Sequence, residues 1–367
     1  MADYQVISAD SHVVEPHDLW QRYVDPAFRG RAPRLVRLDD HDVLRGEEIE
    51  NDAIGLLAGC LRKDDDVRRH GRWETDVFPG GYDPAQRIRD LDLDGIDAEV
   101  LFPTVALTFY PVSDLELLWA LFRAYNTWLA EFCSFAPQRL KGIALLNHED
   151  VGVAVTELTR AQRLGLVGAM LPLFPAASSS YRDPELEPLW RAAAELAMPI
   201  HLHSTTWRSQ ERSFFNVPSA TERLLNTPTQ IQRVVLDMVF SGVFDRHPGL
   251  RVVSVENDAG WAPFLAERGD YWWHRHRQIM PAGEMVCTRP PSAYFADNLR
   301  LTFMRDRVAV LARDLIGSRA LLWGNDFPHH ISTWPHSQEL IDEYRKELDP
   351  DEHQLIFCDN ARQLYRF

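Results

Sequence analysis

Side chains capable of acid–base and metal chemistry follow an apolar run near the carboxyl end of the chain. Residues 320–323 are apolar, and Asp326 and His329 come soon after them on either side of Pro328. A carboxylate just past a buried strand lies where barrel enzymes hold their catalytic groups. Glycine, asparagine, aspartate and proline together also favour an ordinary turn, so this segment alone leaves both interpretations open.

A second pair lies near the amino terminus. Residues 4–9 are predicted to form a strand, and Asp10 and His12 follow it directly. Side chains two residues apart in an extended chain point to the same side. A carboxylate and an imidazole with this spacing can share one metal ion, whereas the alternative is that Asp10 caps a turn and His12 packs.

Two further predicted strands carry polar residues of the same kinds. His201 and His203 share one face of the strand predicted at 198–203, and His203 ends it. Glu256 ends the strand predicted at 250–256. A single buried histidine is more often a core residue than a ligand. Ligand-type residues at four strand ends, however, favour a metal site over chance.

The elements that would position these residues alternate along the chain. Strands are predicted at 4–9, 98–102, 140–146, 166–171, 198–203, 250–256, 299–303 and 320–323. Helices are predicted at 84–95, 114–135, 151–164, 184–196, 229–245, 261–279 and 306–315, with two more at 335–348 and 351–364.

This alternation predicts parallel strands, and eight strand–helix units predict a distorted (β/α)8 TIM barrel whose strand ends converge on one face. A doubly wound sheet is the alternative, but the first strand-to-helix turn lacks GxGxxG. Residues 25–84 are predicted to form an irregular insertion or lid. We expect one domain over 1–367.

Composition excludes several classes of partner. The chain of 367 residues has a formal charge of −15, which argues against nucleic acid and anionic membranes. Its four cysteines are far apart and no long uncharged apolar run is present, as expected of a reduced cytoplasmic protein. A small molecule is therefore the expected substrate.

The order and spacing of several motifs resemble those of a known group of enzymes. The motifs lie at 10–16 (DSHVVEP), 199–203 (PIHLH), 240–251 (FSGVFDRHPGLR), 256–263 (ENDAGWAP), 324–329 (GNDFPH) and 360–365 (NARQLY). Together they resemble the amidohydrolase superfamily, in particular the amidohydrolase-related branch that includes aminocarboxymuconate-semialdehyde and resorcylate-type decarboxylases. The likeness covers nearly the whole chain.

The resemblance implies roles for particular residues. The metal ligands of that branch match Asp10, His12, His203 and Asp326, and Asp326 also matches its acid/base aspartate. Asp10 replaces the first histidine of the HxH motif that is usual in hydrolases. Glu256 stands where many relatives carry a catalytic histidine.

The role of that missing histidine is either changed or taken over by Glu256 or His201, which are both predicted as catalytic residues. His329 is predicted to face the pocket as well, because it follows Asp326 so closely. In contrast, His41, His70, His247, His274 and His276 are assigned structural or solvent roles.

One metal ion is expected rather than two. Many hydrolases of the superfamily bridge two metals with a carbamylated lysine at the end of the fourth strand, where this chain has Met170, Leu171 and Pro172. Two histidines and two carboxylates suit either zinc or manganese. Relatives also imply a homo-oligomer, a dimer.

Three functions fit these residues. The first is decarboxylation of an aromatic or unsaturated acid, with Asp326 protonating carbon. The second is hydrolysis of an amide, ester or lactone by metal-activated water. The third is a non-catalytic binding barrel. Trp207, Phe214 and Phe215 either line a substrate pocket or pack beneath a lid.

Overall fold

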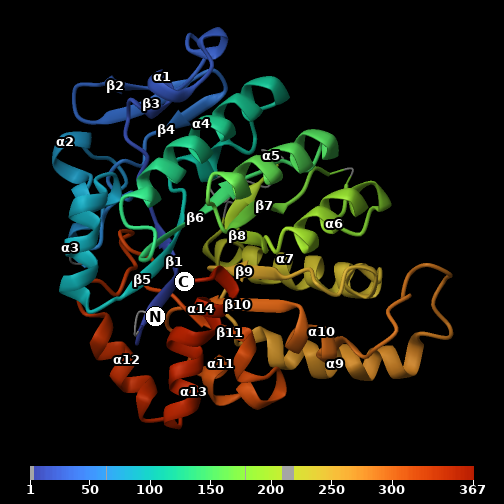
Figure 1. Ribbon diagram of the computed structural model, residues 1–367. Coiled ribbons are helices and arrows are strands. Elements are labelled where there is room, and N and C mark those ends of the chain that lie inside the picture. The colour runs from blue at the N-terminus through green and yellow to red at the C-terminus, as the bar shows by residue number, and fades with distance from the viewer. Residues whose placement is uncertain (1–3, 63, 178, 209–218) are drawn as a thin grey trace.

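The computed structural model describes residues 4–62, 64–177, 179–208 and 219–367, and its centre is a parallel eight-stranded sheet curved into a barrel (Figure 1). The strand order is β1-β5-β6-β7-β8-β9-β10-β11, and every neighbouring pair in it runs parallel. The strands are β1 Ile7–His12, β5 Ala98–Phe102, β6 Leu140–Leu145, β7 Gly168–Phe174, β8 Ile200–Trp207, β9 Val252–Val255, β10 Leu299–Phe303 and β11 Leu321–Trp323. The predicted TIM barrel is confirmed.

The first and last strands meet through the segment that follows β11. The amide of Asp326 donates to the carbonyl of Asp10 at 2.9 Å, and the amide of His12 donates to the carbonyl of Phe327 at 2.7 Å. The same backbone that closes the barrel therefore brings the polar residues of its two ends together.

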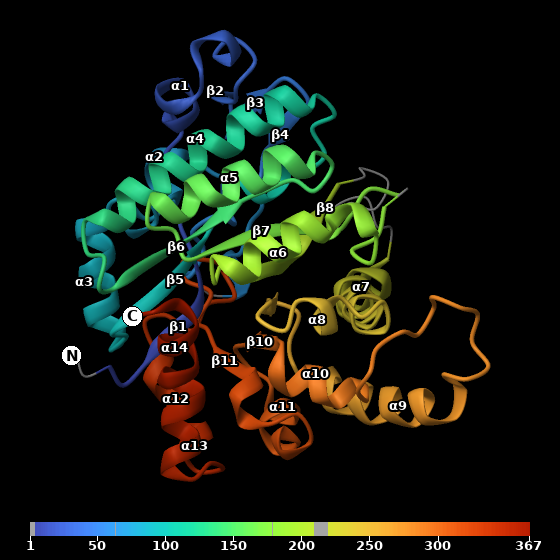
Figure 2. The same cartoon turned by 45° about the vertical axis from the view of Figure 1, so that its right-hand side comes forward.

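Helices surround the barrel and separate its strands in sequence (Figure 2). Several of them begin at an aspartate whose side chain accepts from backbone amides of the first turn, as Asp83, Asp114 and Asp150 do. The helices are α1 Leu19–Tyr23, α2 Trp73–Asp76, α3 Pro84–Asp94, α4 Leu115–Ser134, α5 Val151–Arg163, α6 Glu187–Glu195, α7 Ala220–Phe240, α8 Val243–Arg246, α9 Trp261–His276, α10 Pro291–Asp297, α11 Arg307–Leu311, α12 Ser337–Arg345, α13 Pro350–Gln354 and α14 Asn360–Tyr365.

The insertion between β1 and β5 contains regular structure that the sequence pattern did not predict. Strands β2 Arg34–Arg37, β3 Asp42–Gly46 and β4 Ile49–Asn51 form a small antiparallel sheet. β2 is too short and too exposed to show a clear apolar alternation. The insertion also contacts the barrel, because the amide of Cys60 donates to the carbonyl of Pro328 at 3.1 Å.

Some element bounds differ from those expected. β1 continues through Asp10 and His12, so both residues lie within the strand and not after it. α7 begins at Ala220, nine positions before the predicted start, and ends at Phe240 because Gly242 takes a left-handed conformation with φ 72°. α10 was not predicted at all. Within the described ranges, no helix has the length and apolar character needed to cross a membrane.

Candidate metal centre

Four of the predicted ligands meet at the carboxyl ends of β1, β8 and β11. The Nε2 atom of His12 lies 3.7 Å from Oδ1 of Asp10, 3.2 Å from Oδ1 of Asp326 and 3.3 Å from Nε2 of His203. All four side chains are buried. Two groups of possible ligands therefore share His12, namely Asp10 with His203 and Asp326 with His329, and within each group the ligand atoms lie within 4.8 Å of one another.

The two imidazoles present unprotonated nitrogens to one another. Nδ1 of His12 lies 2.7 Å from the carbonyl oxygen of Pro103, and Nδ1 of His203 lies 2.9 Å from that of Ser204. A carbonyl only accepts, so each Nδ1 carries the proton and each Nε2 carries a lone pair. Burial lowers the pKa of His12 to about 4 and that of His203 to about 3, which keeps both rings neutral near pH 7.

The carboxylates likewise have unused oxygens. Oδ1 of Asp10 and Oδ2 of Asp326 are buried, and neither has a hydrogen-bond partner in the part of the chain that the structure describes. Burial and the charges of Asp326 and Glu256 raise the pKa of Asp10 well above its ordinary value. Facing lone pairs and crowded carboxylates are costly without a cation, so these residues fit a divalent metal ion.

His329 lies beside this cluster and orients Asp326. Its Nδ1 is 2.9 Å from Oδ1 of Asp326, and its Nε2 is 3.1 Å from the hydroxyl of Thr104. Burial acts to raise the pKa of Asp326, but the adjacent His329 lowers it below the ordinary range. Asp326 is therefore a carboxylate with one oxygen held and the other free.

Glu256 lies at the edge of the cluster, with 26% of its side chain exposed. Its Oε2 accepts from the hydroxyl of Ser204 at 2.5 Å and lies 3.5 Å from Nδ1 of His203. Partial burial and the charge of Asp326 raise the pKa of Glu256 to about 7. Glu256 can thus carry a proton near neutral pH.

Backbone strain gathers at the same strand ends. Thr205, Glu256 and Asp326 all have positive φ angles, of 59°, 57° and 54°. This region is costly for residues with a Cβ atom and most of all for a β-branched one. Strain of this kind typically persists where the surrounding structure aims side chains at a functional site.

His201 is not brought into the cluster. Its Nδ1 lies 3.1 Å from the carbonyl oxygen of Ala169, and its Nε2 lies 3.0 Å from the hydroxyl of Tyr365. The ring of Phe102 is 5.4 Å from the rings of both His201 and His203 and lies against each. Both nitrogens of His201 are already engaged, which favours a structural role.

Of the three aromatic residues predicted to line a pocket or pack beneath a lid, only Trp207 lies within the described residues. Trp207 ends β8, is buried, and packs edge-on against Phe174 with ring centroids 6.2 Å apart. Phe214 and Phe215 lie outside the described residues.

Two groups of supporting residues escaped the sequence analysis. Thr302 on β10 donates to Oδ2 of Asp10 at 3.1 Å and accepts from the amide of Glu256 at 3.0 Å. Thr104 holds His329, as described above. A lone threonine at a strand end carries no metal-ligand signal, although its position at the carboxyl end of an apolar strand could have drawn attention to it.

Arg87 forms the second group, and it holds together the backbone segments that meet between β1 and β11. The guanidinium is fully buried, pairs with Glu99, and donates to the carbonyl of His12 at 2.7 Å and to that of Phe327 at 3.4 Å. It also lies 4.5 Å from the ring centre of Phe327. Arg87 falls four positions before buried Leu91 on α3, so helical spacing could have shown that it faces inward.

Comparison with known proteins agrees with this architecture. The sequence model of the family described as "Amidohydrolase" matches residues 66–367. The chain belongs to the amidohydrolase family. The matched range begins after Asp10 and His12, and the distances given above join these two residues to the site.

Individual relatives of this amidohydrolase are similar at low identity. Gamma-resorcylate decarboxylase of Rhodococcus jostii (strain RHA1) is 28% identical over 229 residues, which cover 58% of this chain and 68% of the relative. An amidohydrolase from Mycobacterium avium subsp. paratuberculosis K-10 has the same fold, with a TM-score of 0.80, 22% identity and coverage of 100% and 98%. A third similar protein is the 5-carboxyvanillate decarboxylase of Novosphingobium aromaticivorans DSM 12444, which was solved with manganese and 4-hydroxy-3-methoxy-5-nitrobenzoic acid. It has a TM-score of 0.72 and 18% identity, with coverage of 99% of this chain and 96% of that one.

Proposed function

We propose that this amidohydrolase is a metal-dependent decarboxylase of an aromatic or unsaturated carboxylic acid. The observation that carries the proposal is the buried, unpartnered Oδ2 of Asp326 beside the facing nitrogens of His12 and His203. This oxygen can carry a proton, and it lies next to side chains that suit a cation. The similarity to a decarboxylase of an aromatic acid supports this reaction over hydrolysis.

One divalent ion, manganese or zinc, would be held by Asp10, His12, His203 and Asp326. When bound, such an ion neutralises the substrate carboxylate and a neighbouring oxygen and so fixes the acid in the site. The residues match the ion in kind, because neutral imidazoles and carboxylates are ligands of both metals.

Asp326 would first take up a proton from solvent by way of Glu256 and would then pass it to the substrate carbon that bears the carboxylate. The carbon–carboxylate bond then breaks, carbon dioxide leaves, and the electron pair of that bond restores conjugation. His329 keeps the carboxyl of Asp326 in one orientation through the 2.9 Å contact. Glu256, exposed at the edge and with a pKa of about 7, can return a proton from solvent to the site.

The direct test measures carbon dioxide release from a panel of hydroxybenzoates and muconate-like acids, beside hydrolysis of amides and lactones, with metal content determined on the same sample. We expect carbon dioxide release, about one metal ion per chain, and loss of activity after chelation. Hydrolysis without decarboxylation would contradict the proposed reaction. Full activity after exhaustive chelation would contradict the metal site.

Asp326→Asn tests the proton carrier. The amide is isosteric but cannot deliver the proton, so turnover should fall by about 10²–10⁴-fold while the fold is retained. Circular dichroism and metal content of the variant show whether folding and metal binding survive. Glu339→Gln removes an exposed carboxylate of α12 and controls for the loss of one negative charge. Unchanged turnover in Asp326→Asn would remove Asp326 from the acid role.

A further inference from the structure

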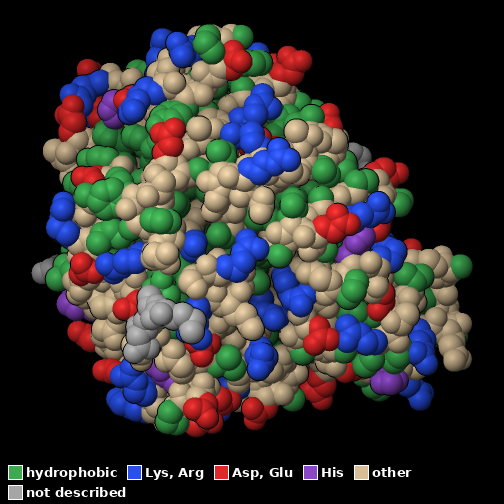
Figure 3. All heavy atoms as spheres, viewed as in Figure 1, with side chains coloured by type: hydrophobic (Ala, Val, Ile, Leu, Met, Phe, Trp, Pro, Cys, Tyr) green, Lys and Arg blue, Asp and Glu red, His purple; other side chains and the backbone are tan. Residues whose placement is uncertain are grey.

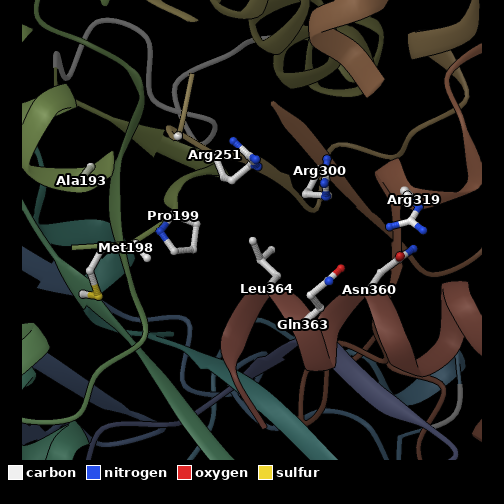
Figure 4. A pocket seen from close by; sticks show the side chains of 11 residues that line it. Ala193, Met198, Pro199, Arg251, Arg300, Arg319, Asn360, Gln363 and Leu364 are labelled. Atoms are coloured by element: carbon white, nitrogen blue, oxygen red, sulfur yellow. The ribbon is translucent and has the colours of Figure 1, made fainter. Parts of the chain in front are cut away.

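A cavity at the amino end of the barrel, opposite the metal centre, is lined by three arginines. Arg251 directly precedes β9, Arg300 lies on β10, and Arg319 lies just before β11, so neighbouring strands bring them together. The cavity has a volume of about 390 Å³, which is within the usual size range of small-molecule sites. Figure 4 shows the three side chains in a row along one side of it.

These guanidinium groups have no acidic partner within the described part of the chain. Among the residues with described positions, none of the three arginines forms an ion pair. Nη1 of Arg251 donates to the carbonyls of Pro248 and Leu250 at 2.9 and 3.1 Å, and Nη1 of Arg300 donates to that of Leu299 at 2.6 Å. The remaining guanidinium nitrogens are left for another acceptor.

The acid whose charge acts on Arg300 is already paired with another arginine. Asp297, whose charge acts on Arg300, pairs with Arg289 at 2.6 Å. Burial and repulsion by the charges of Arg251 and Arg319 lower the pKa of Arg300 to about 10. Arg300 is still positively charged at neutral pH. Such a cluster is unusual in a chain with a formal charge of −15. A bound anion would relieve this repulsion.

The opposite wall of the cavity suits the body of an organic molecule. Asn360, Gln363 and Leu364 of α14 face the arginines across the cavity (Figure 4). Met198 and Pro199 also line it, and both are apolar. In Figure 3, Lys and Arg side chains gather near the middle of the face that α14 occupies in Figure 1.

We propose that this cavity binds a small organic anion, with a phosphate or carboxylate head held by Arg251, Arg300 and Arg319. The planar guanidinium groups match both kinds of head. The apolar wall and the side-chain amide of Gln363 would contact the rest of the molecule, since Asn360 already donates to the carbonyls of Ser318 and Leu321. The site lies at the other end of the barrel from Asp326, so it is separate from the reaction proposed above.

Calorimetric titration of the metal-loaded protein with inorganic phosphate and, separately, with succinate tests this site at constant ionic strength. We expect saturable binding of at least one of them at one site per chain. Arg319→Gln and Arg251→Gln should each weaken that binding about tenfold or more, because each removes a charged hydrogen-bond donor. Arg319 is exposed and has no described partner, so its replacement should leave the melting temperature unchanged.

Arg34→Gln is the matched control, because Arg34 is an exposed arginine on β2 of the insertion and carries the same charge change. It should bind as the wild type does. Preference for phosphate or for succinate identifies the head group. Absence of saturable binding of either anion would overturn the proposal. So would equal weakening by Arg34→Gln, or binding insensitive to Arg319→Gln, which would place the anion elsewhere, including at the metal centre.

Discussion

Thr302 shows how much of the site depends on a residue that is not itself a ligand. Its hydroxyl accepts from the amide of Glu256 and donates to Oδ2 of Asp10, so it ties the ends of β9 and β1 together. Hydrogen bonds to a ligating carboxylate fix its orientation and so raise metal affinity. The other oxygen of Asp10, Oδ1, has no hydrogen-bond partner among the described residues.

Thr302→Val should weaken metal binding about 10–100-fold, because the methyl group keeps the shape but cannot donate to Asp10. The free energy of unfolding should fall by about 1–3 kcal/mol, since the amide of Glu256 loses its acceptor. Metal titration and denaturant unfolding measure the two effects. Thr302→Ser keeps the hydroxyl and should restore most of the affinity. Equal affinities in the valine and serine variants would show that the hydroxyl does not orient Asp10.

The sequence predicts which residues lie near one another at the site, but not the hydrogen-bond partners that orient them. Period-two spacing correctly put Asp10 and His12 on one side of β1, where their side chains approach to 3.7 Å. The same spacing put His201 beside His203, but depth in the barrel separates them. Which nitrogen of each histidine is protonated depends on carbonyls from other segments, such as that of Pro103, and no local pattern predicts such a partner.

Among the helices and strands, Arg87 links several elements near the metal centre. From α3 it reaches the end of β1 at His12 and the segment after β11 at Phe327, and it pairs with Glu99 of β5. One buried charge therefore joins four elements. Its removal would leave Glu99 buried without a partner.

Arg87→Met should lower the free energy of unfolding by about 3–5 kcal/mol, the usual cost of leaving one member of a buried ion pair alone. Urea denaturation measures this change. Arg89→Met is the matched control, because Arg89 is two positions along the same helix, is exposed, and donates to the side chain of Gln86. It should change stability by less than about 0.5 kcal/mol. Similar losses in both variants would mean that helix propensity, and not the buried pair, is responsible.

The barrel could be predicted from the sequence because its elements are long and apolar. Strands such as β5 and β10 have the bounds that were expected, and both are almost completely buried. The small β2–β4 sheet was missed because its strands have only three to five residues and no regular alternation of buried and exposed positions, apart from β4, which is too short to show one. The early start of α7 was not expected from the sequence, because its first turns are exposed and Pro228 follows them within the helix.

For the whole molecule, the two ends of the barrel are opposite in charge. The carboxyl end gathers Asp10, Glu256 and Asp326, whereas the amino end gathers unpaired arginines. In the absence of a cation, the three carboxyl groups repel one another, and this repulsion opposes folding. Metal binding and stability must therefore be linked.

Asp10→Asn should reverse the order of stability of variant and wild type when metal is added, which makes the linkage measurable. Without metal, the variant should be at least as stable as the wild type, because the amide removes one buried charge from a repulsive cluster. At free manganese about 100 times its dissociation constant, the wild type should gain about 2.7 kcal/mol, while the variant gains much less because it lacks a charged ligand. Thermal and urea unfolding with and without a chelator measure both states. An equal gain in both proteins would show that manganese stabilises the fold at a place other than the Asp10 cluster.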